Sequence, residues 1–207
     1  MKSSIEEKVS TKVVEDSVNH VSNDIESNNT DAVVGIPAYN EENTIVSVVL
    51  KALRYVDDVV VVDDGSSDET AELAEEAGAE VIRHETNKGY GVSLHTLILY
   101  AREHDKGPLV IIDGNAKYPA KKIPDLLENI LTGEADITIG SRFLHYNSKN
   151  KPPHNNRLGV GVLKRLSTSR VDVNTPKGGH KKITDRCSGF RAFSKKALKD
   201  LDITEQG

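Results

Sequence analysis

The sequence predicts an α/β fold: a three-layer α/β/α sandwich built around a mainly parallel, Rossmann-like sheet. Two observations lead to this prediction. Short apolar runs, of the kind found in strands buried on both faces, recur along the chain, as at residues 59–62 and 109–112. Between these runs lie segments whose apolar residues recur at helical spacing. Right-handed crossovers between parallel strands then place helices on both faces of the sheet.

The strands follow from runs rich in valine, isoleucine and leucine. They are expected over residues 33–37, 59–63, 80–84 and 109–113, with a fifth beginning at 137–139. A glycine-containing turn at 87–91 follows the third strand and precedes a helix that runs to about residue 104. Strands and helices therefore alternate in the order typical of a parallel sheet.

The other helices are marked by residues at their ends. Asn40 is a suitable N-cap for the helix after the first strand. Residues 66–69 offer a capping box for the next helix, and Gly78 is placed to end it. Pro124 suits the first turn of the helix after the fourth strand, and Gly133 follows its last turn.

The composition limits the class of protein. A chain of 207 residues is long enough for one domain with its own core, expected over residues 31–207, after a polar extension at 1–30 that is either disordered or a loosely packed helix. A net charge of -5 gives no basic excess that would favour nucleic acid. The single cysteine, Cys187, fits a reducing compartment. Without a long apolar run or a signal-peptide core, the expected location is cytoplasmic.

Carboxylates stand where two of the strands end. Asp63 and Asp64 follow the second strand, and Asp113 follows the fourth. Open α/β sheets bind ligands at this carboxyl edge. Carboxylates there can accept hydrogen bonds from a nucleotide and hold a divalent cation that bridges its phosphates. The histidines, His84 among them, show no metal-ligand spacing and are given no role.

A basic segment interrupts the alternation. Residues 144–183 contain nine basic side chains against one acid, Asp172: Lys149, Lys151, Arg157, Lys164, Arg165, Arg170, Lys177, Lys181 and Lys182. The segment is either a solvated loop or an electropositive mouth for phosphate-bearing substrates.

Several motifs occur in the order found in one enzyme family. The segments VGIPAYNEE (34–42) and VDDGSSDET (62–70) resemble the opening of a family 2 glycosyltransferase. NKGYG, IDGN, GSRF and DRCSGFR follow in family order, ending at residue 191. The chain is most similar to the dolichyl-phosphate mannose synthase-like, polyprenyl-phosphate sugar transferases. The resemblance implies a GT-A type of the predicted sandwich. It also implies inverting transfer of a hexose from a UDP- or GDP-sugar to an acceptor, a polyprenyl phosphate.

The resemblance also implies roles for named residues. The expected nucleotide-binding residues are Pro37, Tyr39, Glu41, Asp63, Asp64, Gly65, Ser66, Lys88 and Gly114. Asp64 is the better nucleotide contact of the aspartate pair, whereas Asp63 can simply orient the strand end, and Glu41 can instead cap its own helix. Asp113 would act beside the diphosphate through Mg²⁺ or Mn²⁺.

The remaining catalytic candidates concern the phosphates and the acceptor. Arg142 and Arg191 have fork geometry suited to the diphosphate or the acceptor phosphate, or they form structural ion pairs. A phosphate acceptor is already anionic and needs no strong general base, so none is assigned. Asp185 would be the first candidate for a base if the acceptor were a sugar hydroxyl.

The chain departs from the family at its metal motif, which is Asp-x-Asp in these enzymes. Here Asn115 replaces the second aspartate, keeping a ligating oxygen but losing the charge, and Lys117 adds a cation. Three alternatives stay open: Asp113 and the diphosphate hold the metal, Lys117 contacts phosphate directly, or the chain binds a nucleotide sugar without turnover, as a module or partner subunit.

The second departure is length, because family members continue beyond the position of Gly207. The expectation is a domain truncated at its C-terminus, whose peripheral contact with the cytosolic face of a membrane depends on residues 144–183. No nucleic-acid partner is expected, and the oligomeric state stays open.

Overall fold

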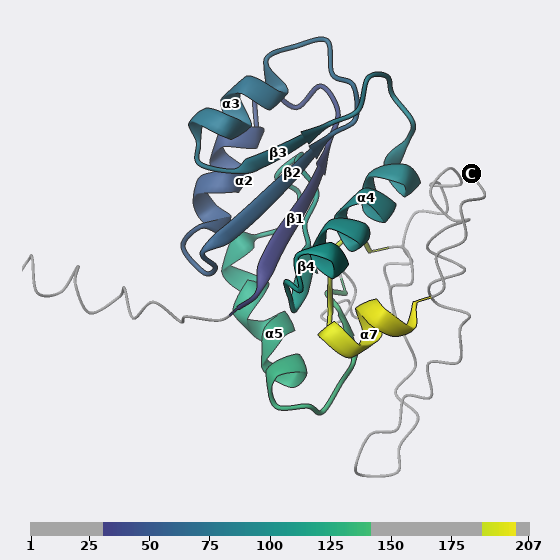
Figure 1. Ribbon diagram of the computed structural model, residues 1–207. Coiled ribbons are helices and arrows are strands. Elements are labelled where there is room, and N and C mark those ends of the chain that lie inside the picture. Colours follow the sequence, from purple (N-terminus) through teal and green to yellow (C-terminus); the bar gives the residue numbers. More distant parts are fainter. Residues whose placement is uncertain (1–30, 142–187, 202–207) are drawn as a thin grey trace, which may run out of the picture.

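A computed structural model describes residues 31–141 and 188–201 of the chain. These residues form a six-stranded mixed sheet with helices on both faces (Figure 1). The predicted extension at 1–30 and the basic segment at 144–183 lie outside the described residues, as do Arg142 and Asp185. The predicted α/β architecture with a mainly parallel sheet is confirmed.

The sheet has the strand order β3-β2-β1-β4-β6-β5. The strands are β1 (Val33–Ala38), β2 (Asp58–Asp63), β3 (Glu80–Arg83), β4 (Leu109–Ile111), β5 (Ile137–Ile139) and β6 (Arg191–Phe193). The first four pair in parallel, and β6 lies antiparallel between β4 and β5. The strands expected from the apolar runs are therefore present, with bounds shifted by one or two residues. The antiparallel strand β6, which comes from the DRCSGFR motif and the residues after it, was not predicted.

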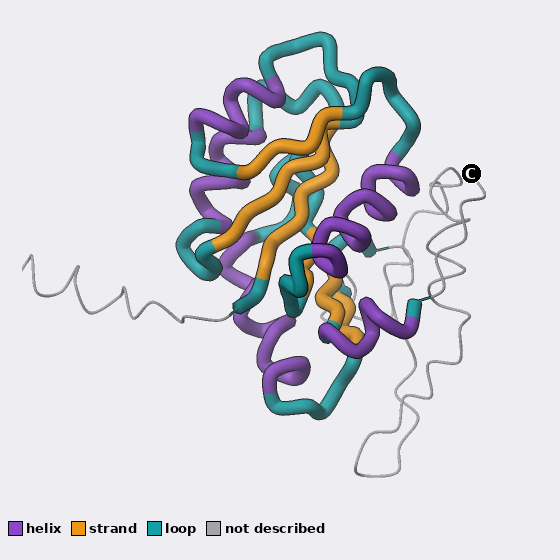
Figure 2. Tube along the Cα trace, viewed as in Figure 1, coloured by secondary structure: helices purple, strands orange, loops and turns teal. Residues whose placement is uncertain are grey.

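Helices cover the sheet on both sides (Figures 1 and 2). One side carries α2 (Ile45–Ala52), α3 (Thr70–Glu76) and α5 (Ile123–Leu131), the last preceded by the 3₁₀ turn η1 (Ala120–Lys122). The other side carries α4 (Tyr90–Glu103) and α7 (Lys195–Asp200). No helix within the described residues is long and apolar enough to cross a membrane.

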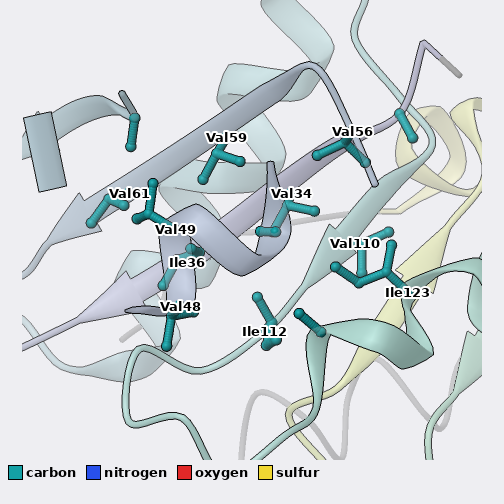
Figure 3. Close-up of a cluster of buried hydrophobic side chains, with 14 of the residues drawn as sticks. Val34, Ile36, Val48, Val49, Val56, Val59, Val61, Val110, Ile112 and Ile123 are labelled. Atoms are coloured by element: carbon teal, nitrogen blue, oxygen red, sulfur yellow. The ribbon is translucent and has the colours of Figure 1, made fainter. Parts of the chain in front are cut away.

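The core is divided in two by the sheet because successive side chains of a strand point to opposite faces. On one face, Val34 and Ile36 of β1 pack with Val49 of α2 (Figure 3). On the other, Val33 packs in the cluster that contains Leu97 of α4. Both faces are thus buried, which explains why these strands are almost wholly apolar.

The ends of two helices differ from the prediction. Asn40 does not cap α2, whose N-cap position is Thr44. Residues 66–69 form no capping box, since α3 begins at Thr70 and Glu69 at its N-cap position makes no side-chain cap bond. The predicted capping side chains instead satisfy backbone N–H groups of a neighbouring loop. The stops at Gly78 and Gly133 are confirmed, and both glycines have positive φ, of 94° and 73°.

Candidate functional site

A cleft of about 340 Å³ opens at the carboxyl edge of the parallel strands. The end of β1 and the segments that follow β1, β2, β3 and β4 line it, together with the start of α4. Its lining residues are Pro37, Ala38, Tyr39, Glu41, Asp64, Asn87, Gly89, Tyr90, Ser93, Asp113, Gly114 and Asn115. The structure therefore brings Asp64 and Asp113 to one cleft, together with most of the residues predicted after β1. Asp63, Gly65, Ser66, Lys88 and Arg191 are not among the lining residues.

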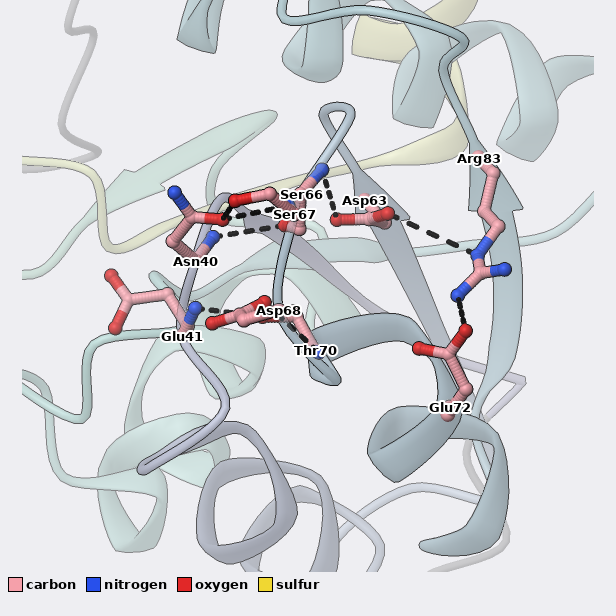
Figure 4. A network of polar contacts seen from close by, with 9 residues as sticks. All are labelled: Asn40, Glu41, Asp63, Ser66, Ser67, Asp68, Thr70, Glu72 and Arg83. Atoms are coloured by element: carbon pink, nitrogen blue, oxygen red, sulfur yellow. Dashed lines mark hydrogen bonds and ion pairs between the residues drawn. The ribbon is translucent and has the colours of Figure 1, made fainter.

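The loops after β1 and β2 are cross-linked by reciprocal hydrogen bonds (Figure 4). The backbone N–H of Asn40 donates to Ser66 Oγ at 2.9 Å, and the N–H of Ser67 donates back to Asn40 Oδ1 at 3.0 Å. The N–H of Glu41 donates to Thr70 Oγ1 at 2.7 Å. These bonds hold the loop that carries Tyr39 and Glu41 in one conformation, so this wall of the cleft is pre-organised.

Asp68 extends the same cross-link and makes it sensitive to acid. Burial acts to raise the pKa of Asp68, but hydrogen bonds from Thr70 and Glu42 outweigh it, and the pKa lies below its ordinary value. A carboxyl whose folded-state pKa is lowered contributes stability above its unfolded value, and the contribution is lost as the pH falls through the folded value. Asp68→Asn is therefore expected to lower the melting temperature at pH 7, and the difference should disappear at a strongly acidic pH, below the folded-state pKa of Asp68. Thermal unfolding at both pH values checks this, with Glu76→Gln on the exposed face of α3 as the control.

Asp63 and Asp64 have separate surroundings although they are adjacent. Asp63 accepts from the N–H of Ser66 at 3.2 Å and lies 3.9 Å from Nε of Arg83, so it supports the turn after β2 (Figure 4). Asp64 faces the cleft and accepts the N–H groups of Lys88 (3.0 Å) and Gly89 (2.7 Å).

Asp64 also contacts a histidine that the sequence analysis gave no role. His84 Nδ1 lies 2.7 Å from Asp64 Oδ1, and the two side chains are 8% and 5% exposed. With His84 and Lys88 at Oδ1 and Gly89 at Oδ2, three of the roughly four acceptor positions of this carboxylate are used within the protein. Among the described residues, the acceptor position that stays open is on Oδ2.

A third loop, which follows β3, packs against the turn after β2 at Gly65, which has a φ of 72°. A β-carbon on Gly65 would lie 2.6 Å from the carbonyl carbon of Thr86 and 2.7 Å from the nitrogen of Asn87. Only glycine fits both this backbone conformation and this spacing. Gly65 thus lets the segment before α4 approach the turn after β2 and close one end of the cleft.

Asp113 lies at the other end of the cleft, between α4 and the 188–191 segment. Tyr90 Oη donates to Asp113 Oδ1 at 3.0 Å. Burial, followed by the charge of Asp113 and this hydrogen bond, raises the pKa of Tyr90 far above its ordinary value, so the hydroxyl keeps its proton. Gly189 lies against both side chains, and a β-carbon there would be 2.6 Å from Asp113 Oδ1. The position of this carboxylate is thus defined by Tyr90 and by the absence of a side chain at Gly189.

The segment that carries Gly189 is itself fixed. Ser188 Oγ donates to the carbonyl of Gly140 at 2.6 Å, and Phe190 stacks on Tyr118 with ring centroids 5.5 Å apart. Arg191, 3% exposed, donates from Nε to the carbonyl of Ser188 at 2.8 Å. Arg191 therefore contacts the segment beside Asp113, and it is not among the residues that line the cleft.

The metal motif is only partly suited to a cation. Asp113 offers a carboxylate at the cleft, but Asn115 Oδ1 already accepts the backbone N–H of Lys117 at 3.1 Å. Within residues 31–141 and 188–201, no three histidine, cysteine or acidic side chains form a metal-binding group. A divalent cation here would need oxygens from a ligand as well as from Asp113. The Lys117 side chain is exposed, and its backbone rather than its ammonium group contacts Asn115.

Further residues of the site escaped the sequence analysis. Tyr90 and Gly189 lie inside quoted motifs but were given no role. Ser93 lines the cleft, and its hydroxyl is buried with no hydrogen-bond partner in the described part of the chain. His84 follows β3 at the same sheet edge as Asp64, and this shared edge was the signal that could have singled it out.

Comparisons with known proteins agree with this architecture. The model of Glycosyl transferase family 2 matches residues 33–202. The chain is 32% identical over 177 residues to a dolichyl-phosphate hexose transferase of Haloferax volcanii, covering 84% of this chain and 71% of the relative. It is 30% identical over 184 residues to a UDP-N-acetylglucosamine--dolichyl-phosphate N-acetylglucosaminyltransferase of Methanococcus voltae, covering 80% and 70%.

A solved structure has the same fold. Glucosyl-3-phosphoglycerate synthase from Mycobacterium tuberculosis, in complex with Mn²⁺, uridine-diphosphate-glucose and phosphoglyceric acid, aligns with a TM-score of 0.51 and 25% sequence identity. The match covers 80% of this chain and 56% of that one. For one further curated relative, the matched part is only 41% of the relative's length. The family match over residues 33–202 and the 32% identity to a relative matched over 71% of its length show that the chain belongs to glycosyl transferase family 2.

Proposed function

We propose that this chain is a hexosyltransferase domain, spanning residues 31–207, that uses a UDP- or GDP-sugar and a polyprenyl phosphate and inverts the transferred anomeric carbon. The observation that carries the proposal is the cleft, which joins a pre-organised loop after β1 to the carboxylates of Asp64 and Asp113. The names of two relatives support the acceptor class, since both act on dolichyl phosphate.

In this proposal the nucleoside lies between the loops after β1 and β2. Tyr39, 47% exposed at the cleft, offers a face on which a base can stack. The open position of Asp64 Oδ2 accepts a hydrogen bond from the base or the ribose. Asp63, Gly65 and Ser66 keep these loops in place, and Lys88 takes part through its backbone N–H.

The diphosphate then lies toward Asp113 and Gly114. We propose that Asp113, together with the diphosphate, holds Mg²⁺ or Mn²⁺, in keeping with the Mn²⁺ in the solved relative. The cation would neutralise charge that develops on the leaving group. Arg142 and Asp185 remain candidates for contacting the acceptor, and Arg191 acts by supporting the segment beside Asp113.

A phosphate acceptor fits a site in which no residue is assigned as general base. A phosphate monoester is anionic near neutral pH, so the transfer requires positioning, leaving-group neutralisation and exclusion of water. Peripheral contact with the cytosolic face of a membrane, through the basic segment 144–183, is part of the same proposal.

The alternative is a nucleotide-sugar-binding module without turnover. It is favoured by one observation: the Asn115 oxygen that would complete the metal motif bonds to the backbone of Lys117. The two functions differ in the effect of the metal on donor binding. A transferase that relies on Asp113 and a cation binds the donor more tightly when the metal is present, whereas the module does not need the metal.

Calorimetric titration of UDP, GDP and their hexose conjugates, with and without Mn²⁺, tests the proposal. We expect base-selective binding that strengthens with Mn²⁺. Binding that ignores the metal and is accompanied by no transfer would favour the module instead. Failure to bind any of these nucleotides would rule out both functions.

Asn115→Asp sharpens the metal part of this experiment. The substitution restores a carboxylate beside Asp113, and an added anionic ligand strengthens cation binding. We expect the affinity for Mn²⁺ in the presence of nucleotide to rise on the order of tenfold. Asp125→Asn, on the exposed face of α5, changes one acidic residue away from the cleft and serves as the control. An unchanged Mn²⁺ affinity in Asn115→Asp would show that the metal does not reach this position.

A further inference from the structure

We propose that His84 is a positioning residue of the nucleotide site: it anchors the carboxylate of Asp64 where that side chain faces the cleft. The inference rests on the proposed function, because it assumes that the cleft receives a nucleoside diphosphate. Nothing in the spacing of the histidines points to this role, which comes from the three-dimensional surroundings of the ring.

His84 is bonded at both ring nitrogens. Nδ1 lies 2.7 Å from Asp64 Oδ1, and Nε2 lies 3.0 Å from Thr96 Oγ1 on α4. The side chain is only 8% exposed. The ring therefore links the end of β2 to the first turns of α4, on which Tyr90 and Ser93 line the cleft.

The contacts on the two sides of the ring fix its orientation. Nδ1–H donates to a carboxylate oxygen of Asp64, which can only accept. On the other side, Nε2 shares a hydrogen bond with Thr96 Oγ1, which itself lies 3.1 Å from the carbonyl of Val92. The ring is therefore held between β2 and α4, and it holds the Asp64 side chain in turn.

This anchoring matters because Asp64 faces a cleft proposed to bind a nucleoside diphosphate. Asp64 also accepts the N–H groups of Lys88 and Gly89 and so shapes the backbone that leads into α4. His84 thereby fixes the carboxylate and, through it, the loop that precedes α4.

Three variants test the two anchors of the ring. His84→Ala removes both hydrogen bonds. His84→Asn keeps a donor near the Nδ1 position. Thr96→Val removes the second anchor and leaves the pair with Asp64 intact. His104→Asn is the matched control, because His104 ends the same helix and its Nδ1 contacts the Tyr100 carbonyl at 2.9 Å, away from the cleft.

Titration of UDP and GDP with Mg²⁺ present provides the measurement. We expect His84→Ala to weaken binding about 10–100-fold, the range found when partners that orient a ligand-binding group are removed. His84→Asn should recover part of that loss, and Thr96→Val should lose less than His84→Ala.

The outcomes distinguish this inference from the proposed function. If wild type binds and His84→Ala binds equally well, the positioning role is overturned while the proposed function stands. If His84→Asn fails to improve on His84→Ala, the Nδ1 hydrogen bond to Asp64 is not what supports binding, and the positioning role is likewise overturned. If wild type binds neither nucleotide, both proposals fail. Thermal unfolding of each variant verifies the fold, and His84→Asn keeps the test valid if His84→Ala does not fold.

Discussion

Asp113→Ala is expected to reduce sugar transfer by about 10²–10³-fold, the scale found when one group that stabilises charge in a transition state is removed. The reason is the location of Asp113. It lines the cleft after β4, at the place where the proposed metal and diphosphate meet. Nucleotide affinity should survive in part, because Tyr39, Asp64 and the cross-linked loops are untouched. Transfer rates and UDP or GDP titrations on the same preparation check both parts.

Two comparisons make the Asp113 result interpretable. Asp113→Asn keeps the shape of the side chain and an acceptor for Tyr90, so it isolates the loss of charge. Asp125→Ala removes a carboxylate paired with Lys122 on the surface, a kind of contact that contributes little to stability, and it should transfer normally. Unchanged transfer in Asp113→Ala would overturn the metal-assisted mechanism. Loss of nucleotide binding in Asp113→Asn would indicate that Asp113 contacts the nucleotide itself.

The parallel part of the sheet was predictable because its signal is local. The runs of β1, β2 and β4 are buried on both faces, and burial of this kind requires nearly continuous apolar sequence. Strand direction then followed from the helices between the strands. The same reasoning placed Asp64 and Asp113 at one edge, where the cleft lies. A prediction of this sort needs only the residues of each element and its neighbours in sequence.

The predicted N-caps of α2 and α3 were wrong because contacts between distant segments use the same side chains. Asn40 and Ser66 have side chains typical of N-caps, but in the fold they bond across to each other's loops. Asn40 also has a φ of 53°, a left-handed conformation outside the helix. A capping preference says that a side chain will satisfy a backbone N–H group, but it does not say which loop supplies that group. Sequence spacing alone therefore could not decide whether these side chains cap their own helices or bond to a neighbouring loop.

The antiparallel strand β6 and the role of His84 were missed for a related reason. β6 inserts between β4 and β5 although it follows both in sequence, so no alternation of elements predicts its position. His84 reaches Asp64 because β3 pairs with β2 in the register that sets Arg83 opposite Asp63. Both features depend on pairing between distant segments. They become visible only when the sheet is assembled.

Gly189→Ala is expected to impair catalysis by moving Asp113, although the change adds a single methyl group. That carbon would lie 2.6 Å from Asp113 Oδ1 and 2.8 Å from Tyr90 Oη, well inside van der Waals contact. Either the carboxylate or the 188–191 segment must shift, and Ser188 is held by the carbonyl of Gly140. A displacement near 1 Å in a catalytic group can cost about 10²-fold in rate, so we expect a loss of this size. Overpacking should also cost about 1–3 kcal/mol of stability.

Gly78→Ala is the matched control for this change, because it separates loss of stability from displacement at the site. Gly78 has a φ of 94°, so alanine there is strained, but its β-carbon would meet only Leu53, at 3.6 Å. Both alanine variants should therefore melt at lower temperature than wild type, whereas only Gly189→Ala should lose transfer. Tyr90→Phe, which removes the hydrogen bond to Asp113 without adding an atom, should give a smaller rate loss. If Gly189→Ala transfers sugar as well as Gly78→Ala does, Asp113 either tolerates displacement or is not the group on which the rate depends. The Asp113 variants decide between those two cases, because only the second predicts that they too remain active.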